Sequence, residues 1–295
     1  MAETIFIRQS AISEFRECRR RWHYNYIRDL EPIYPDGQRP FRTADIGTLV
    51  HLGVQLYYSG EFDPAQVLLV MRGWADEEFP GWEVVTKPMA DVHKGVRLAL
   101  KMIEGWIEDL ATTGVDKGET TVWCEKQLEV ELPGVWGDGG HKVVVTGKPD
   151  RLLRHEDFGL ILEDTKTTDK LDSSLIYAEQ LTRYAVIIRI AGEGAINRLR
   201  TQQIKKVLRN GEGPFFSRPF LVMNDARYKS GWGHLYTDIR DMVRVVEEMD
   251  DNPFLITPNP GLNCNWKCAY NAPCESADDG GHSEQIVELH YRKRT

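Results

Sequence analysis

Carboxylates and a lysine stand close together in two neighbouring stretches of this chain. Asp150 closes the stretch Gly147-Lys-Pro-Asp, and Asp164 and Lys166 flank a threonine in a later apolar run. Residues two apart on a strand point to the same face, so Asp164 and Lys166 project together. We expect a turn at residues 155–159, which would bring Asp150 on the preceding strand to meet them. Two carboxylates and a lysine at one point suit a hard cation, an activated water and phosphodiester hydrolysis.

These carboxylates are the expected metal ligands. Mg²⁺ and Mn²⁺ prefer carboxylate and carbonyl oxygen, so we expect Asp150, Asp164 and the Thr165 carbonyl to bind the ion. The ion would lower the pKa of a bound water, and Lys166 would orient that water or stabilise the anionic transition state. Because Asp-x-Lys is very common by itself, an exposed hairpin with ordinary charges is the alternative.

Two upstream residues are further candidates. His51 follows Gly47-Thr-Leu-Val at the start of an expected helix, and an imidazole ligand would shift the metal preference towards Mn²⁺. A purely structural histidine is the alternative at such a position. Glu125 lies on a strand expected before the hairpin and would supply another carboxylate.

Gln180 and Tyr184 stand four residues apart on a helix expected over residues 173–190. That spacing puts both side chains on one face of the helix. An amide and a hydroxyl facing the metal site would hold a phosphate or a base edge. The alternative is a helix that packs through its apolar residues, Leu181, Tyr184 and Ile188.

Three of the five cysteines cluster near the end of the chain as Cys264-x3-Cys268-x5-Cys274, and Cys18 lies near its start. The first ten residues do not resemble a signal peptide, so a reducing compartment and metal binding are expected rather than disulfides. Four thiolates bind either zinc or an iron–sulfur cluster, and the residues alone do not choose between them. Either would staple the two ends of the chain together. Cys124 is expected to be buried and to take no part in this metal site.

Composition bounds the class of protein. A chain of 295 residues with 41% hydrophobic residues can bury a substantial core. It has no apolar run near the ~20 residues that a membrane span needs. We expect a cytoplasmic protein, prokaryotic or in the host cytoplasm if phage-encoded. The net charge of −8 argues mildly against general nucleic-acid binding, although clustered charge matters more.

Such a basic cluster occurs at Arg19, Arg20 and Arg21, which aromatic residues follow closely. Cationic groups bind phosphates and aromatic rings stack on unpaired bases, so these arginines are candidate DNA contacts. An amphipathic helix with a solvated basic face is the alternative, and both can hold at once.

Taken in order, these motifs resemble the RecB-like branch of the PD-(D/E)XK nuclease superfamily. Within it, the chain is similar to iron–sulfur nucleases: CRISPR-associated and phage RecB-like exonucleases and the AddB nuclease domain. The resemblance covers residues 10–274. The matching residues are Cys18 with its basic and aromatic followers, Gly47 to His51, Gly147 to Asp150, Asp164 with Lys166, Gln180 with Tyr184, and Cys264, Cys268 and Cys274.

The resemblance implies a metal-dependent DNA exonuclease that acts on DNA ends or single strands. It gives metal-binding and catalytic roles to His51, Asp150, Asp164 and Lys166. It also implies a four-iron, four-sulfur cluster on the four cysteines and partners in recombination or CRISPR adaptation. The usual last triad is Cys-x2-Cys-x5-Cys, and the extra residue here slightly raises the odds of zinc, or of a distorted or labile cluster. A catalytically silent DNA-binding or assembly subunit is the alternative function.

The expected fold is α/β, with a central mixed sheet flanked by helices in a restriction-endonuclease-like core. We expect a single nuclease domain over residues 1–295, with a helical cap at 43–115, the core at 120–223 and a cysteine-cluster subdomain at 10–28 plus 255–278. The expected elements outside the hairpin are a helix at 10–28, strands at 196–207 and 215–223, and a helix at 224–249.

Overall fold

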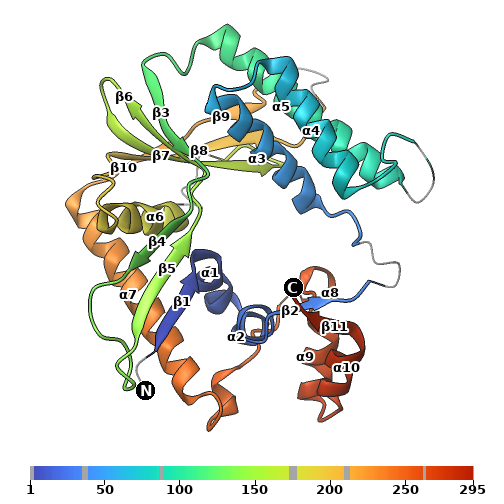
Figure 1. The fold of residues 1–295 in the computed structure, drawn as a ribbon, viewed down its shortest axis with the longest axis vertical. Helices are drawn as coiled ribbons and strands as arrows, with labels where there is room; N and C mark the ends of the chain where they lie inside the picture. The colour runs from blue at the N-terminus through green and yellow to red at the C-terminus, as the bar shows by residue number, and fades with distance from the viewer. Residues whose placement is uncertain are drawn as a thin grey trace. The chain divides into compact units, whose positions relative to one another are not determined.

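The computed structural model divides into two units (Figure 1). The sheet unit comprises residues 41–128 and 148–231, and the cysteine unit comprises residues 1–40, 129–147 and 232–295. The structure describes residues 3–34, 39–84, 86, 89–172, 178–208, 213–261 and 264–294.

A six-stranded mixed sheet is the centre of the sheet unit, as the sequence predicts. Its order is β10-β8-β7-β6-β3, with β9 paired to β8. Among the described pairings within this sheet, only the β7–β8 pair is parallel. The strands are β3 (Glu119–Cys124), β6 (Arg151–His155), β7 (Gly159–Thr168), β8 (Arg198–Lys205), β9 (Phe216–Ser217) and β10 (Phe220–Val222).

The predicted hairpin is the β6–β7 pair, and a glycine closes its turn. Gly159 has a φ of +71°, which strains any other residue. A Cβ atom there would lie 2.6 Å from Oδ1 of Asn197. The carbonyl oxygen of that same amide accepts the backbone N–H of Leu160 at 3.0 Å, which ties the start of β7 to the segment before β8.

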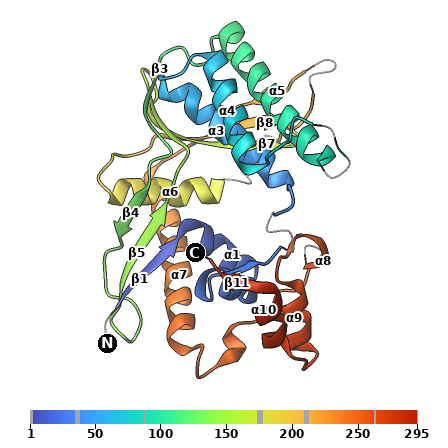
Figure 2. The same cartoon turned by 45° about the vertical axis from the view of Figure 1, so that its right-hand side comes forward.

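Helices cover both faces of this sheet (Figures 1 and 2). Lys166 contacts α6, whereas its neighbour Thr167 faces α3, 3.4 Å from the Cβ position of Gly47. The helices α3, α4 and α5 share one hydrophobic cluster with Ile204 of β8. The helix bounds are α3 (Thr43–Ser59), α4 (Pro64–Glu78), α5 (Ala90–Thr113) and α6 (Ala178–Ile190). The helices expected to form a cap, α3, α4 and α5, therefore form a layer on the sheet. The domain boundaries expected from the sequence stay predictions.

A buried ionic network lies on the α3 side of the sheet. Glu163 is 0% exposed, and its carboxylate binds Arg151 at 3.0 Å and Arg200 at 2.6 Å. Burial by itself raises the pKa of Glu163, but the charges of Arg200 and Arg151 outweigh it and lower that pKa to about 2. Glu119 accepts from both arginines too, and the Arg151 guanidinium lies 3.4 Å above the Tyr58 ring of α3. The charge pairs join four strands of the sheet, and the contact between Arg151 and Tyr58 links α3 to this face.

The cysteine unit holds two small sheets and the helices around them. One sheet has the order β1-β5-β4, with β1 parallel to β5, and β2 pairs antiparallel to β11. The strands are β1 (Thr4–Arg8), β2 (Leu30–Pro32), β4 (Leu128–Glu131), β5 (Lys142–Gly147) and β11 (Tyr291–Lys293). The helices are α1 (Gln9–Glu17), α2 (Arg19–Trp22), most of α7 (Asp225–Glu248), α8 (Cys264–Lys267), α9 (Asn271–Asp278) and α10 (Ser283–His290).

The prediction of one helix over residues 10–28 is wrong. Cys18 is extended, with φ −161° and ψ 110°, and separates α1 from α2. Its sulfur accepts the backbone N–H of Arg21 at 3.5 Å, so Cys18 caps the second helix. The hydrophobic pattern hides the break because Phe15 and Trp22 still pack edge to face, 4.9 Å apart. A π-helical turn follows at His23–Ile27.

Other elements follow the sequence closely. The helix predicted at 224–249 is α7, and the strand predicted at 196–207 is β8. The predicted strand at 215–223 is two short strands, and residues 173–177 of the predicted Gln180 helix lie outside the described residues. Within the described ranges, every helix is too short or too polar to cross a membrane.

Candidate active site

The hairpin brings the predicted carboxylates together. Asp150 directly precedes β6, and its Oδ2 accepts the backbone N–H of Thr165 at 2.7 Å. Asp164 and Lys166 share a face of β7, where the Lys166 Nζ lies 3.0 Å from Oδ1 of Asp164. The Asp164 side chain is 5% exposed and that of Lys166 is 23% exposed. Thr165 is buried, and ligation by its carbonyl stays a prediction.

The helix α3 supplies His51 from its third turn. The His51 Nδ1 lies 3.2 Å from Oδ2 of Asp150. Burial lowers the pKa of His51, but its hydrogen bond to Asp150 and the Asp150 charge outweigh burial and raise that pKa above its ordinary value. The structure thus joins a residue about 100 positions upstream to the predicted hairpin site.

Glu125 completes a compact group that the sequence only hinted at. His51, Glu125 and Asp150 each offer one ligand atom, and these atoms all lie within 4.8 Å of one another. The Glu125 backbone has a φ of +50°, and its N–H donates to the Asp150 carbonyl at 2.7 Å. Lys148 Nζ lies 2.8 Å from the Glu125 carboxylate. The pairing of Cys124 in β3 with Arg151 in β6 sets Glu125 opposite Asp150. The sequence does not show this pairing, so it gives little reason to place Glu125 in the site.

Anionic groups are crowded in this site. Burial, followed by the neighbouring Asp150 charge, raises the pKa of Asp164 to about 6 despite the Lys166 ammonium. Burial and Asp150 likewise raise the pKa of Glu125. Carboxylates that oppose one another's ionisation favour a bound cation, and imidazole plus carboxylate is a donor set that suits Mn²⁺ or Mg²⁺. The residues present therefore fit the divalent ion.

Gln180 and Tyr184 face the hairpin from α6. The Lys166 Nζ donates to Oε1 of Gln180 at 3.4 Å. Tyr184 is 7% exposed, and its hydroxyl hydrogen-bonds Gln180 and the backbone of Lys148. Burial raises the pKa of Tyr184 to about 12, so the hydroxyl stays protonated. Both side chains brace Lys166 and the turn before Asp150, and their predicted contact with a DNA strand stays a prediction.

The three candidate DNA-binding arginines lie in the cysteine unit, and each pairs with a carboxylate. Arg19 binds Asp241, Arg20 binds Asp278 and Arg21 binds Glu17. These pairs occupy the guanidinium groups that the sequence assigned to phosphate. The DNA-binding role of the three arginines stays a prediction.

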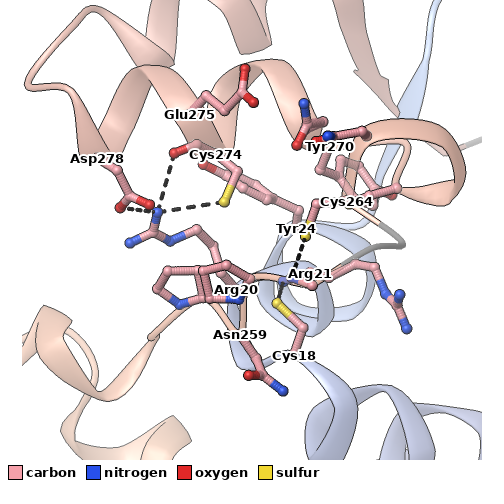
Figure 3. Close-up of a pocket in the computed structure, with 16 residues that line it drawn as sticks. Cys18, Arg20, Arg21, Tyr24, Asn259, Cys264, Tyr270, Cys274, Glu275 and Asp278 are labelled. Atoms are coloured by element: carbon pink, nitrogen blue, oxygen red, sulfur yellow. Dashed lines mark hydrogen bonds and ion pairs between the residues drawn. The ribbon is translucent and has the colours of Figure 1, made fainter.

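The four predicted cluster ligands line one cavity of about 190 Å³ in the cysteine unit (Figure 3). Cys18 comes from the N-terminal segment, and Cys264, Cys268 and Cys274 come from the C-terminal segment. All four are free thiols. The rings of Tyr24, Tyr270 and Tyr291 stack with centroids 5.5 and 5.6 Å apart, and Cys268 packs against this cluster. A convergent set of four thiols fits a tetrahedral metal ion or an iron–sulfur cluster.

Cys124 stands apart from this set. It ends β3 and does not line the cavity. Burial raises the pKa of its thiol to about 11, which keeps it protonated and unreactive at neutral pH.

Comparison with solved structures finds distant likenesses to this chain. No curated protein matches it. A crystal structure from Eubacterium rectale, described provisionally as an exonuclease, matches at 12% identity over 90% of this chain and 88% of its own, with a TM-score of 0.48. The crystal structure of SSO0001 matches at 15% identity over 77% of this chain and 82% of its own, with a TM-score of 0.30. Both likenesses are too distant to carry an argument about activity.

The family comparison is far more extensive. A family model matches residues 8–275, a span that includes every motif residue from Cys18 to Cys274. The site's two aspartates and lysine on a mixed sheet agree with that match. This protein therefore belongs to the PD-(D/E)XK nuclease superfamily.

Proposed function

We propose that this protein is a divalent-metal-dependent deoxyribonuclease of the RecB-like iron–sulfur branch, acting as an exonuclease on DNA ends or single strands. The observation that carries the proposal is the meeting of His51, Glu125 and Asp150 beside the Asp164–Lys166 pair. Superfamily membership supports the nuclease reaction.

Each residue of the candidate active site would have a role that follows from its position. Asp150, Asp164 and His51 would hold Mg²⁺ or Mn²⁺, with Glu125 and the Thr165 carbonyl as further donors. A bound ion lowers the pKa of its water and offsets charge that develops at phosphorus. Asp150 also fixes the hairpin itself, because the same carboxylate accepts the Thr165 N–H.

Lys166 is the group held ready for the reacting phosphate. Asp164 and Gln180 hold its ammonium from two sides, at 3.0 and 3.4 Å. A donor fixed in advance needs no reorganisation when negative charge develops, and this makes it effective. Lys166 would orient the attacking water or donate to the anionic phosphoryl oxygen.

For the cysteine centre we propose a four-iron, four-sulfur cluster. The motif resemblance supports this assignment, and the four thiols that line one cavity would be its ligands. Binding of this cluster would link the N- and C-terminal segments and would restrict the conformations of the unfolded chain.

The proposed setting is recombination, repair, or a related phage or CRISPR process in the cytoplasm, with protein partners from that process. DNA is the proposed partner of the active site. Both statements rest on the motif resemblance together with the superfamily match.

A cleavage assay on end-labelled DNA tests the proposal. Linear and circular DNA, single- and double-stranded, are incubated with anaerobically purified protein and Mg²⁺ or Mn²⁺. We expect degradation of linear DNA alone, and a fall of about 10²–10³-fold in Lys166→Ala because a fixed donor is lost. Lys101→Ala, an exposed lysine on α5, serves as the matched control and keeps the wild-type rate.

Two outcomes would contradict the proposal. Cleavage of circular DNA would make the enzyme an endonuclease. Failure of the cluster-loaded wild type to cleave any substrate would favour a catalytically silent DNA-binding or assembly subunit.

A further inference from the structure

Every sulfur of the cysteine centre has its own N–H donor. Three donors are backbone amides, and the fourth is a guanidinium nitrogen. The pairs are Arg21 N to Cys18 at 3.5 Å, Gly261 N to Cys264 at 3.4 Å, Tyr270 N to Cys268, and Arg20 Nη1 to Cys274 at 3.5 Å. Hydrogen bonds to cysteine sulfur stabilise the thiolate form and tune a bound cluster.

Arg20 differs from the other donors because it makes several contacts at once (Figure 3). Its Nη1 contacts the carbonyl oxygen of Cys274 at 3.2 Å as well as the sulfur. The same nitrogen lies 2.6 Å from Oδ1 of Asp278, at the end of α9. The backbone N–H of Arg20 donates to the Thr257 carbonyl at 3.2 Å, which fixes its place at the cavity wall.

The negative groups around Cys274 favour a cation at the position of Arg20. A centre with four thiolates is net negative, whether it holds zinc or an iron–sulfur cluster. The Asp278 carboxylate adds a further negative charge, and it contacts the same Arg20 nitrogen that contacts Cys274. Without the guanidinium, the carboxylate and the thiolate would repel each other across the vacated space.

We propose that Arg20 is a positioning residue of the cysteine centre, which orients Cys274, offsets its negative charge and is itself held by Asp278. The inference rests on the metal-binding centre of the proposed function. It gives Arg20 a role distinct from the DNA contact that the sequence indicates. A single guanidinium nitrogen, Nη1, makes the contacts with Cys274 and with Asp278.

Retention of the metal centre tests the role. Wild type, Arg20→Gln and Arg19→Gln are purified anaerobically, analysed for iron, sulfide and zinc, and then challenged with a chelator. Arg19 is the matched control, since it lies on the same helix and pairs with Asp241 but has no described contact with a cysteine. We expect Arg20→Gln to lose its metal about tenfold faster than wild type, and Arg19→Gln to match wild type.

A second variant separates the charge effect from lost packing. Arg20→Gln leaves Asp278 unpaired beside Cys274, so the double variant Arg20→Gln/Asp278→Asn recovers part of the metal retention. A purely structural role for Arg20 predicts a double variant at least as labile as the single one. For an iron–sulfur centre, loss of the cation also lowers the midpoint potential, because the reduced cluster carries the greater negative charge.

The outcomes distinguish this inference from the proposed function. Wild-type protein with neither iron nor zinc would remove the cysteine centre from the proposed function and overturn this inference with it. Loaded wild type with equal retention in Arg20→Gln, or equal loss in both arginine variants, would overturn the role of Arg20 alone.

Discussion

At the scale of single residues, burial of Asp164 beside Asp150 destabilises the metal-free protein and supplies a carboxylate for the proposed metal ion. Its pKa is raised to about 6 by burial and by Asp150, so ionisation at neutral pH costs the metal-free protein stability. The folded pKa lies above the unfolded value, so this contribution is favourable below about pH 4 and is lost as pH rises through about 6. A bound divalent ion would remove the penalty by pairing with the carboxylate.

Replacing this aspartate should separate the two effects. In EDTA at pH 7, we expect Asp164→Asn to be more stable than wild type by about 1–3 kcal/mol, from a shift near two pKa units. At pH 4 that advantage should vanish, and the variant should not cleave DNA. Urea unfolding at both pH values measures this, and a destabilised variant at pH 7 would contradict the electrostatic account.

Glu163, the neighbour of Asp164 on the opposite face, has the reverse dependence. Its folded pKa of about 2 lies below its ordinary value, so its stabilisation is present above about pH 4.5 and is lost as pH falls through 2. We expect Glu163→Gln to cost roughly 3 kcal/mol at pH 7, since it leaves Arg151 and Arg200 short of a partner. The cost should shrink at pH 3. Denaturant unfolding at the two pH values checks this, and a cost independent of pH would contradict it.

At the scale of elements, close packing of three helices holds His51 near the hairpin. A Cβ atom at Gly53 of α3 would lie 2.7 Å from both Ile103 of α5 and Met71 of α4. Gly53→Ala should therefore cost about 1–3 kcal/mol through overpacking, and should weaken metal binding by displacing His51. Gly73→Ala on α4 is the matched control, because nothing lies within 4 Å of that Cβ position. It should gain up to about 1 kcal/mol from helix propensity.

Thermal melts and Mn²⁺ titration of the two glycine variants measure these effects. Equal stabilities would show that the helices separate easily at Gly53. The position of His51 would then depend on its own contacts and not on the packing of its helix.

Alternation along strands explains why the sequence reveals the hairpin chemistry. Asp164 and Lys166 share a face whatever surrounds them, and the turn before Gly159 sets their partner strand. Glu125 is different, because a register shift between Thr121 and Trp123 and a left-handed backbone at Glu125 itself bring it to Asp150. Such local irregularities leave no periodic signature.

At the scale of the whole molecule, distant pairings are what the sequence cannot reveal. Asp241 and Asp278, the partners of Arg19 and Arg20, lie more than 200 residues away along the chain. The sequence alone therefore shows a basic cluster without the carboxylates that pair with it. The break at Cys18 has no signature in the hydrophobic pattern either, and Cys18 lines a cavity with three cysteines that are distant in sequence.

The two units predict two cooperative transitions in calorimetry. The cysteine centre belongs wholly to one unit and the candidate active site wholly to the other. Cys18→Ser should lose iron and lower one transition by more than about 4 °C, leaving the other in place. A single transition that moves as a whole would show that the units unfold together.

The central claim is that a metal site centred on Asp150 cleaves DNA. The most direct test is the initial rate of linear DNA degradation as a function of Mg²⁺ and Mn²⁺ concentration, for wild type and Asp150→Asn. We predict no cleavage in EDTA, a saturable rise with either ion, a lower half-saturating concentration for Mn²⁺, and a loss of at least about 10²-fold in Asp150→Asn. Cleavage by wild type in EDTA, or an undiminished rate in Asp150→Asn, would contradict the account.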